Sequence, residues 1–243
     1  LVFATGTSSE NPRAELYSFG TGKRELIGET RLDSTITSFE SIKYAKTDEG
    51  TSIYADALCS DGSSMVTEFI YWSDYYNSII SPFYSYSTGR TKETLRSSQV
   101  TCRDIDDDGY IEIPEDTSSK KQSSEITSQN WVNYGNTVLS HKCYSFSCKR
   151  DGYILVIDDD DFSKVKANYD SESRKLTIIN KKNKSNVFEI VTLINSNYSV
   201  NDPKYKDYTM IMKNSGFVYL AKVNKSSDID INIQTLKDMI KVY

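Results

Sequence analysis

Hydrophobic residues in the first half of the chain recur in short runs, with turn-forming residues between them. β-Branched and aromatic residues are frequent in these runs, and Gly22, Gly50 and Gly62 separate several of them. Runs spaced by roughly ten residues, with no helical period, predict antiparallel strands. The expected strands cover residues 1–5, 15–19, 25–30, 38–46, 52–58, 65–72 and 79–86. No helix is expected before residue 117.

The second half combines strands with one C-terminal helix. The expected strands cover residues 131–134, 142–148, 153–157, 175–180, 187–194, 208–213 and 217–223, with a short helical turn after Ile157. Ile233, Leu236 and Ile240 recur at helical spacing, which predicts a helix over 231–241 that Asp230 caps. The predicted fold class is mainly β: an antiparallel sandwich, barrel or propeller, followed by an α+β module.

Charge changes sign along the chain. Residues 1–116 carry 10 Lys and Arg against 20 Asp and Glu, whereas residues 117–243 carry 19 against 14. The polar segment 117–130 has Ile126 as its single large aliphatic residue and reads as a linker. We therefore expect a β-propeller-like region over 1–116, a linker over 117–130 and an α+β module over 131–243.

The sequence argues against nucleic-acid binding and against a membrane span. The basic half contains Arg150 and Arg174 but otherwise scattered lysines, which argues against nucleic-acid binding. No run of 18 apolar residues exists, so we expect no transmembrane segment.

The chain opens on Leu1 inside an apolar stretch, so we expect the natural N-terminus, with any signal or lipid anchor, to be missing.

The cysteines give an open prediction. None of Cys59, Cys102, Cys143 and Cys148 forms a CxxC pair, and the chain has one histidine, so a structural zinc site is not expected. Cys143 and Cys148 are the pair expected to be bridged if the compartment is oxidising. Four buried thiols are the equal alternative.

The most specific feature is the segment DIDDDGYIE at residues 104–112. Calcium prefers six to eight oxygen ligands, and carboxylates at alternate positions of a tight loop converge on one point. We predict a structural calcium site formed by Asp104, Asp106, Asp108, the Tyr110 carbonyl and Glu112. The alternative is a solvated acidic turn.

The spacing also fits an EF-hand loop, with Glu115 at its twelfth position. Two features favour strands around the loop instead. Residues 98–102 are β-like rather than an amphipathic helix, and Pro114 stands where the exit helix would begin.

The run CRDIDDDGYIEIP at residues 102–114 resembles the aspartate loop of FG-GAP or VCBS-type β-propeller repeats, and more closely that of propeller-type lipoproteins of gut Firmicutes. Residues 15–19 and 52–69 resemble blade strands, and 131–134 with 151–156 resemble a C-terminal α+β module. Asp107 stands where the family usually has Gly or Asn, and Phe162 near the usual Trp of the short helix. The resemblance implies an extracellular or surface-anchored propeller-type protein.

Other candidate residues have simpler interpretations. The acidic run 158–161 suits a helix start, with a second metal site as the alternative. His141 has Ser140 beside it but no recognisable nucleophile elbow, so it is expected to be a surface residue. An aromatic cluster suits strand packing or, alternatively, a stacking platform for a carbohydrate or peptide; its members are Trp72, Tyr75, Tyr76, Phe83, Tyr84 and Tyr86. We expect a non-enzymatic extracytoplasmic protein that binds a protein or carbohydrate ligand at the cell surface, or acts as a scaffold there. The alternatives are a carbohydrate-active hydrolase that uses acids of the first half, and a purely structural ectodomain.

Overall fold

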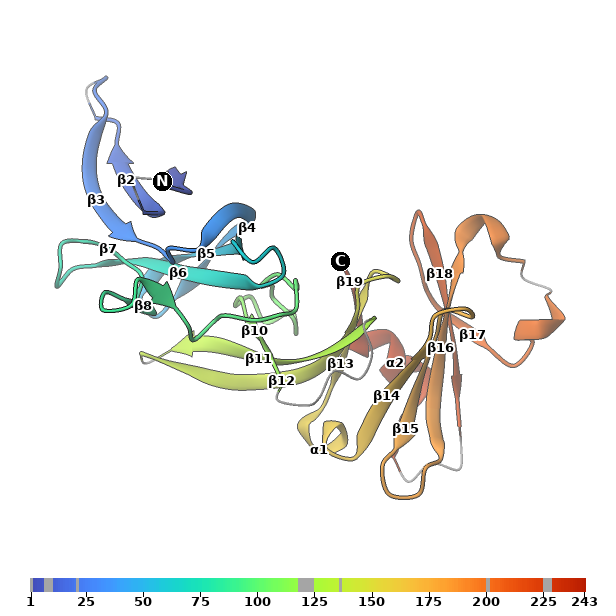
Figure 1. Ribbon diagram of the computed structural model, residues 1–243. Helices are drawn as coiled ribbons and strands as arrows, with labels where there is room; N and C mark the ends of the chain where they lie inside the picture. The colour runs from blue at the N-terminus through green and yellow to red at the C-terminus, as the bar shows by residue number, and fades with distance from the viewer. Residues whose placement is uncertain are drawn as a thin grey trace. The chain divides into compact units, whose positions relative to one another are not determined.

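The computed structural model describes residues 2–6, 11–20, 22–117, 125–135, 137–199, 202–224 and 229–243. The protein is mainly β, with 55% strand and 8% helix. The strands form several antiparallel sheets, and a small helix lies near the C-terminus (Figure 1). The predicted mainly β class is therefore confirmed, whereas the described strands form no closed barrel or propeller.

Two compact units divide the chain. The first contains residues 1–116 and 130–142, and the second contains 117–129 and 143–243. The break after residue 116 falls where the charge changes sign. The predicted module start at 131 differs from this division, because residues 130–142 group with the first unit. Residues 126–130 belong to a strand rather than to the predicted linker, of which 118–124 lie outside the described residues.

The first unit holds the early strands. Their bounds are β1 Val2–Ala4, β2 Arg13–Ser18, β3 Glu25–Arg31, β4 Ile36–Thr47, β5 Gly50–Cys59, β6 Met65–Ser73, β7 Ser78–Ile80, β8 Tyr84–Ser85, β9 Arg90–Thr91 and β10 Ile113–Asp116. The strand expected over 79–86 is interrupted, because Pro82 begins a turn in which the Tyr84 N–H donates to the Ser81 carbonyl (3.2 Å).

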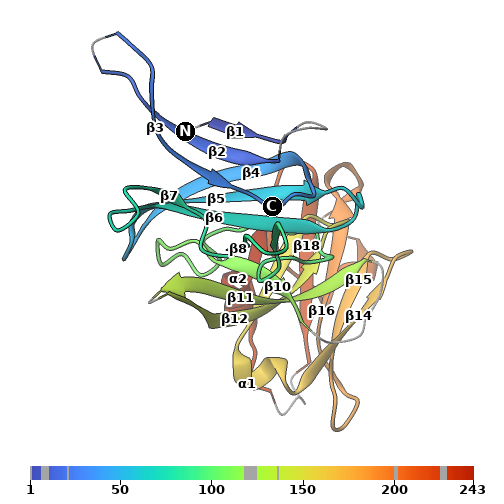
Figure 2. The same cartoon turned by 60° about the vertical axis from the view of Figure 1, so that its left-hand side comes forward.

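The sheet β4–β5–β6–β7 is the middle layer of this unit (Figure 2). On β6, Val66 and Ile70 pack into one core with residues of β2, whereas Phe69 and Tyr71 pack into a second core with Tyr134. Successive side chains point to opposite faces of a strand, and here both faces are buried. Polar residues of β5 and β6 are buried as well, among them Asp56 and Glu68.

Strands β11 Ile126–Gly135 and β12 Val138–Cys148 contribute residues to both units. The remaining elements belong to the second unit. Their bounds are β13 Tyr153–Ile157, α1 Asp159–Phe162, β14 Val165–Asp170, β15 Lys175–Asn180, β16 Asn186–Ile194, the 3-10 turns Asn195–Asn197 and Pro203–Tyr205, β17 Thr209–Lys213, β18 Phe217–Val223, α2 Ile233–Met239 and β19 Ile240–Val242. Strands over 153–157, 175–180 and 217–223 are confirmed with the predicted bounds.

The second unit has one core. Side chains from the sheet β14–β15–β16–β18–β17, from β13 and from α2 meet in it. Helix α2 contacts β13, β17, β18 and β19 through its buried Leu236 face. No helix in the described part of the chain is long and apolar enough to cross a membrane.

The C-terminal helix is shorter than predicted. Asn232, not Asp230, caps it, because the Asn232 side chain accepts from the N–H groups of Gln234 (2.8 Å) and Thr235 (3.0 Å). The helix ends at Met239, and Ile240 begins a strand that pairs with β13. Pairing with an open sheet edge thus overrides the helical spacing of Ile240.

The predicted bridge between Cys143 and Cys148 is wrong. All four cysteines are free thiols, and this pair lies on the single strand β12. Five residues of extended chain separate Cα atoms by roughly 16 Å, far beyond the reach of a disulfide. The buried-thiol alternative describes Cys59, Cys102 and Cys148.

A candidate metal centre at the aspartate loop

The aspartate loop is closed by a short antiparallel bridge. The Arg103 N–H donates to the Glu112 carbonyl (3.0 Å), and the Glu112 N–H donates to the Arg103 carbonyl (2.9 Å). Strand β10 follows at Ile113, so the loop has strand-like flanks and no exit helix. Glu115 accepts from the Asn130 side chain (2.9 Å) and does not complete an EF-hand. The expected strand after the loop is confirmed, whereas residues 98–102 before it form no strand and only Arg103 makes an isolated bridge.

Three aspartates converge inside the loop. One carboxylate oxygen from each of Asp104, Asp106 and Asp108 lies within 4.8 Å of the other two. Asp104 also shapes the turn, because its oxygens accept from the N–H groups of Asp108 (3.0 Å) and Gly109 (2.8 Å). The alternate spacing therefore brings together the residues that the sequence predicted, in a loop narrow enough for one cation.

The backbone of the loop explains the unusual Asp107. Its φ is 63°, in the left-handed region, where Asp is one of the few residues other than glycine that are tolerated. Gly109, with φ of 91°, makes the second left-handed turn. The Tyr110 N–H then donates to the Asp108 carboxylate (2.9 Å), which fixes the exit of the loop.

A lysine supplies a counter-charge. The Lys142 ammonium on β12 lies 3.1 Å from Asp106 Oδ2 and 2.5 Å from Asp108 Oδ2. The hydrogen bonds from Lys142 and from the Tyr110 N–H lower the pKa of Asp108. The carboxylates of Asp108 and Asp106 in turn raise the pKa of Lys142. The sequence analysis missed Lys142, because it lies far from the loop along the chain and no local pattern marks it.

Glu112, the fourth predicted carboxylate, is not one of the three whose oxygens converge. Its side chain is fully buried, and Oε2 accepts from the Ile105 N–H (3.0 Å), between Asp104 and Asp106. Oε1 has no hydrogen-bond partner among the described residues. Burial, together with the charges of the three aspartates, raises the pKa of Glu112 to about 7. A buried oxygen without a partner is costly, and a bound cation would relieve that cost.

These oxygens fit a hard cation. Ionised carboxylates have spare lone pairs even where they accept a backbone N–H, so Asp104 and Asp108 keep coordinating capacity. Oxygen-only donors suit calcium or magnesium rather than zinc, and a loop of several carboxylates suits the larger ion. The chain can offer this cation Asp104, Asp106 and Asp108, whereas Glu112 and the Tyr110 carbonyl stay predicted ligands.

The base of the loop is anchored to a buried ion pair. The Cys102 N–H donates to Asp56 Oδ2 (2.9 Å), and Asp56 Oδ1 lies 2.8 Å from the Arg96 guanidinium. The Lys43 ammonium donates to the Cys102 carbonyl. Both Asp56 and Arg96 are fully buried, so the segment entering the loop is held by charges inside the core.

Two further acidic residues of the first unit are buried inside it. Asp33 and Glu68 are fully buried, and Glu68 accepts from the Asp33 N–H (2.7 Å). Asp33 also pairs with Arg90 at 2.9 Å. These carboxylates have hydrogen-bond partners within the core, as Asp56 does.

The remaining candidates have structural settings. Asp158 is the N-terminal cap residue of α1, and Asp159–Asp161 fill its first turn. His141 is exposed and contacts Asn130. In the aromatic cluster, Phe83 and Tyr84 pack inward, whereas Tyr75 and Tyr76 are 88% and 65% exposed.

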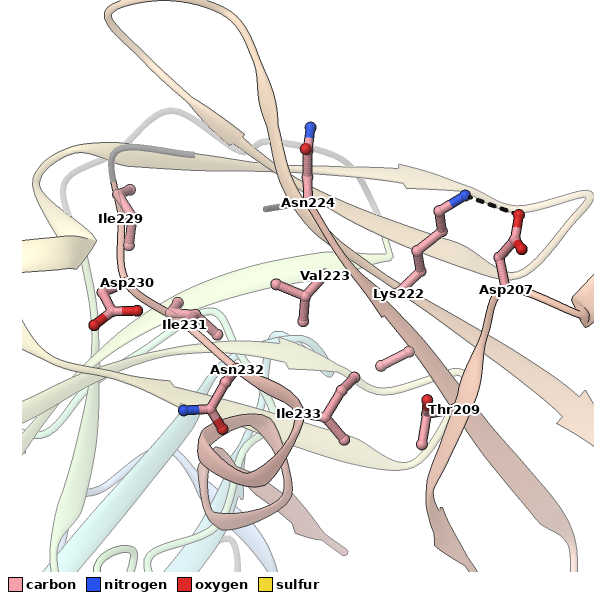
Figure 3. A pocket seen from close by; sticks show the side chains of 11 residues that line it. Asp207, Thr209, Lys222, Val223, Asn224, Ile229, Asp230, Ile231, Asn232 and Ile233 are labelled. Atoms are coloured by element: carbon pink, nitrogen blue, oxygen red, sulfur yellow. Dashed lines mark hydrogen bonds and ion pairs between the residues drawn. The ribbon is translucent and has the colours of Figure 1, made fainter. Parts of the chain in front are cut away.

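A hollow of about 630 Å³ lies in the second unit beside the start of α2 (Figure 3). Apolar side chains of Val223, Ile231 and Ile233 line it, with an ion pair of 3.5 Å between Lys222 and Asp207 at one side. We assign no function to it.

Comparison with known proteins returns no relative. No family model, no curated protein and no solved structure matches this chain. The resemblance of the aspartate loop to propeller-type lipoproteins therefore stays a prediction, and the functional argument depends on the geometry of the loop.

Proposed function

We propose that this chain is a non-enzymatic extracytoplasmic protein that binds a ligand, or acts as a scaffold, at the cell surface, and that calcium braces its aspartate loop. One observation carries the metal assignment. Three aspartate oxygens lie within 4.8 Å of one another, and in the same loop Oε1 of the buried Glu112 has no hydrogen-bond partner among the described residues. The surface location is supported by the resemblance of residues 102–114 to loops of propeller-type lipoproteins. The meander β4–β7 has four strands, as a single propeller blade has.

The proposed role of calcium is structural. The loop joins the segment after Cys102 to β10, and both ends are tied to the core of the first unit. A cation shared by residues 104–112 would hold this connection together without an open coordination position for a substrate. Calcium should therefore change stability rather than activity.

Calcium is expected to stabilise the first unit by about 2.7 kcal/mol at a hundredfold excess over its dissociation constant. Both tryptophans, Trp72 and Trp131, belong to this unit, so tryptophan fluorescence follows its unfolding alone. Asp106→Ala removes one ligand and should abolish the gain. Urea unfolding with calcium chloride and with chelator measures the difference.

The matched control is Asp107→Asn, which removes a neighbouring charge but none of the three converging oxygens. Asn tolerates the positive φ of this position, so the loop should keep its shape and its response to calcium. A wild-type unfolding midpoint that is the same in calcium and in chelator would leave the loop as a solvated acidic turn.

Exposed aromatic residues support a binding role. Tyr75 and Tyr76 contact each other edge to face in the turn between β6 and β7, beside Trp72. The Trp72 indole N–H donates to Asp74 (3.0 Å), which orders the turn. Exposed aromatic rings are typical contacts for carbohydrate and protein ligands. Quenching of Trp72 fluorescence by soluble oligosaccharides, lost in Tyr75→Ala, would support a carbohydrate ligand; no quenching would exclude the tested sugars.

A further inference from the structure

We propose that Lys142 is an internal competitor for the cation at the aspartate loop, and that it sets the affinity of the site. This inference rests on the proposed calcium site and adds the residue that tunes it. The ammonium of Lys142 occupies the position of a counter-ion between Asp106 and Asp108, at 3.1 Å and 2.5 Å.

The competition follows from the particular carboxylate oxygens that Lys142 binds. Asp108 Oδ1 already accepts the Tyr110 N–H, so Oδ2 is its more available ligand atom, and Lys142 binds that atom. Lys142 also binds Asp106 Oδ2. A cation that coordinates both aspartates must therefore share these oxygens with the ammonium or displace it.

Lys142 is only a partial substitute for a metal. One ammonium faces three aspartates, and its ion pairs with Asp106 and Asp108 reach two of them. The buried Glu112 Oε1 still has no partner in the described structure, although its other oxygen is fixed by the Ile105 N–H. A divalent cation brings twice the charge and accepts several oxygens at once, so it can gain contacts that Lys142 does not make.

The exchange is physically accessible. The Lys142 side chain is 29% exposed, and those of Asp106 and Asp108 are each 31% exposed. A displaced ammonium on a four-carbon stem can turn to water while its backbone stays in β12. The cation-free loop would thus be held by Lys142, and the loaded loop by the metal, with β12 retained in both states.

Replacement of Lys142 is expected to raise calcium affinity about tenfold, because calcium then no longer has to break two partly exposed ion pairs of ordinary strength. Lys142→Gln keeps a polar chain of similar length without the charge. Isothermal titration with calcium chloride measures the dissociation constant of the full chain. The control is Lys46→Gln, which removes the same charge from an exposed position on β4 of the same unit and should change affinity less than twofold.

A second measurement separates competition from a general charge effect. In chelator, Lys142→Gln should unfold at a lower urea concentration than the wild type, because the cation-free loop loses its counter-ion. In saturating calcium the two should unfold alike. Equal affinities for wild type and Lys142→Gln would overturn the competitor role while leaving the calcium site in place. No calcium binding by either protein would overturn both the site and the competition.

Discussion

Arg96→Ala is expected to lower the free energy of unfolding of the first unit by about 3–5 kcal/mol, because it leaves a buried carboxylate without its partner. The side chains of Arg96 and Asp56 are both fully buried, and their closest atoms are 2.8 Å apart. The buried ion pair gains little relative to an apolar pair, but the isolated charge is strongly unfavourable.

The guanidinium also satisfies neutral groups. Arg96 Nε donates to the Val100 carbonyl (2.9 Å), and Nη1 donates to the Thr67 hydroxyl (2.9 Å) and the Thr94 carbonyl (3.0 Å). Alanine leaves each of these buried acceptors with one hydrogen bond fewer. Because Val100 and Cys102 lead into the aspartate loop, the same change should also weaken calcium binding.

Urea unfolding followed by tryptophan fluorescence measures this loss. Arg31→Ala is the matched control, since Arg31 is exposed on β3 and its removal should change stability by less than about 0.5 kcal/mol. The double variant Asp56→Leu/Arg96→Met should be more stable than Arg96→Ala alone, because it removes both charges together. A loss below about 1 kcal/mol for Arg96→Ala would show that water or another cation replaces the guanidinium.

The strands could be predicted wherever local sequence alone determined them. Apolar runs between turn residues located β5, β6 and β13, because burial of such a run is nearly independent of its partner strand. Strand β14 was missed although Val165 and Ala167 alternate with exposed residues. The conversion of Ile240 from helix to strand depends on the edge of β13, which no local pattern reveals.

The candidate site also has a part that local sequence predicts and a part that it does not. The three aspartates are close in space because they alternate within one tight loop, so their convergence was predictable from spacing. Lys142 and the anchor at Asp56 are brought to the loop by the packing of distant strands. Sequence reasoning gave these charges no role, because a buried charged residue on a strand resembles an exposed one until its partner is known.

Glu68→Gln is expected to remove much of a fall in stability between pH 5 and 8. Glu68 is fully buried on β6, and burial raises its pKa to about 7 from an ordinary 4.5, against the opposing hydrogen bonds from the Asp33 N–H, Ser81 and Thr91. The folded chain therefore holds a proton that the unfolded chain releases above pH 4.5. The contribution of Glu68 to the free energy of unfolding is fully present below pH 4.5 and falls as the pH rises. The fall ends above pH 7, where the total loss is on the order of 3 kcal/mol.

Glutamine can keep the same contacts without titrating. Its oxygen can accept from the Asp33 N–H, now 2.7 Å from Glu68, and its amide can donate to the Ser81 hydroxyl, now 2.8 Å away. Urea unfolding at pH 5, 6, 7 and 8, followed by tryptophan fluorescence, should show similar stability at pH 5 and a more stable variant at pH 8. A residual slope should persist, because the pKa of Glu112 is also raised to about 7. The exposed control Glu93→Gln should keep the wild-type profile, and an unchanged profile in Glu68→Gln would mean that Glu68 is ionised throughout this range.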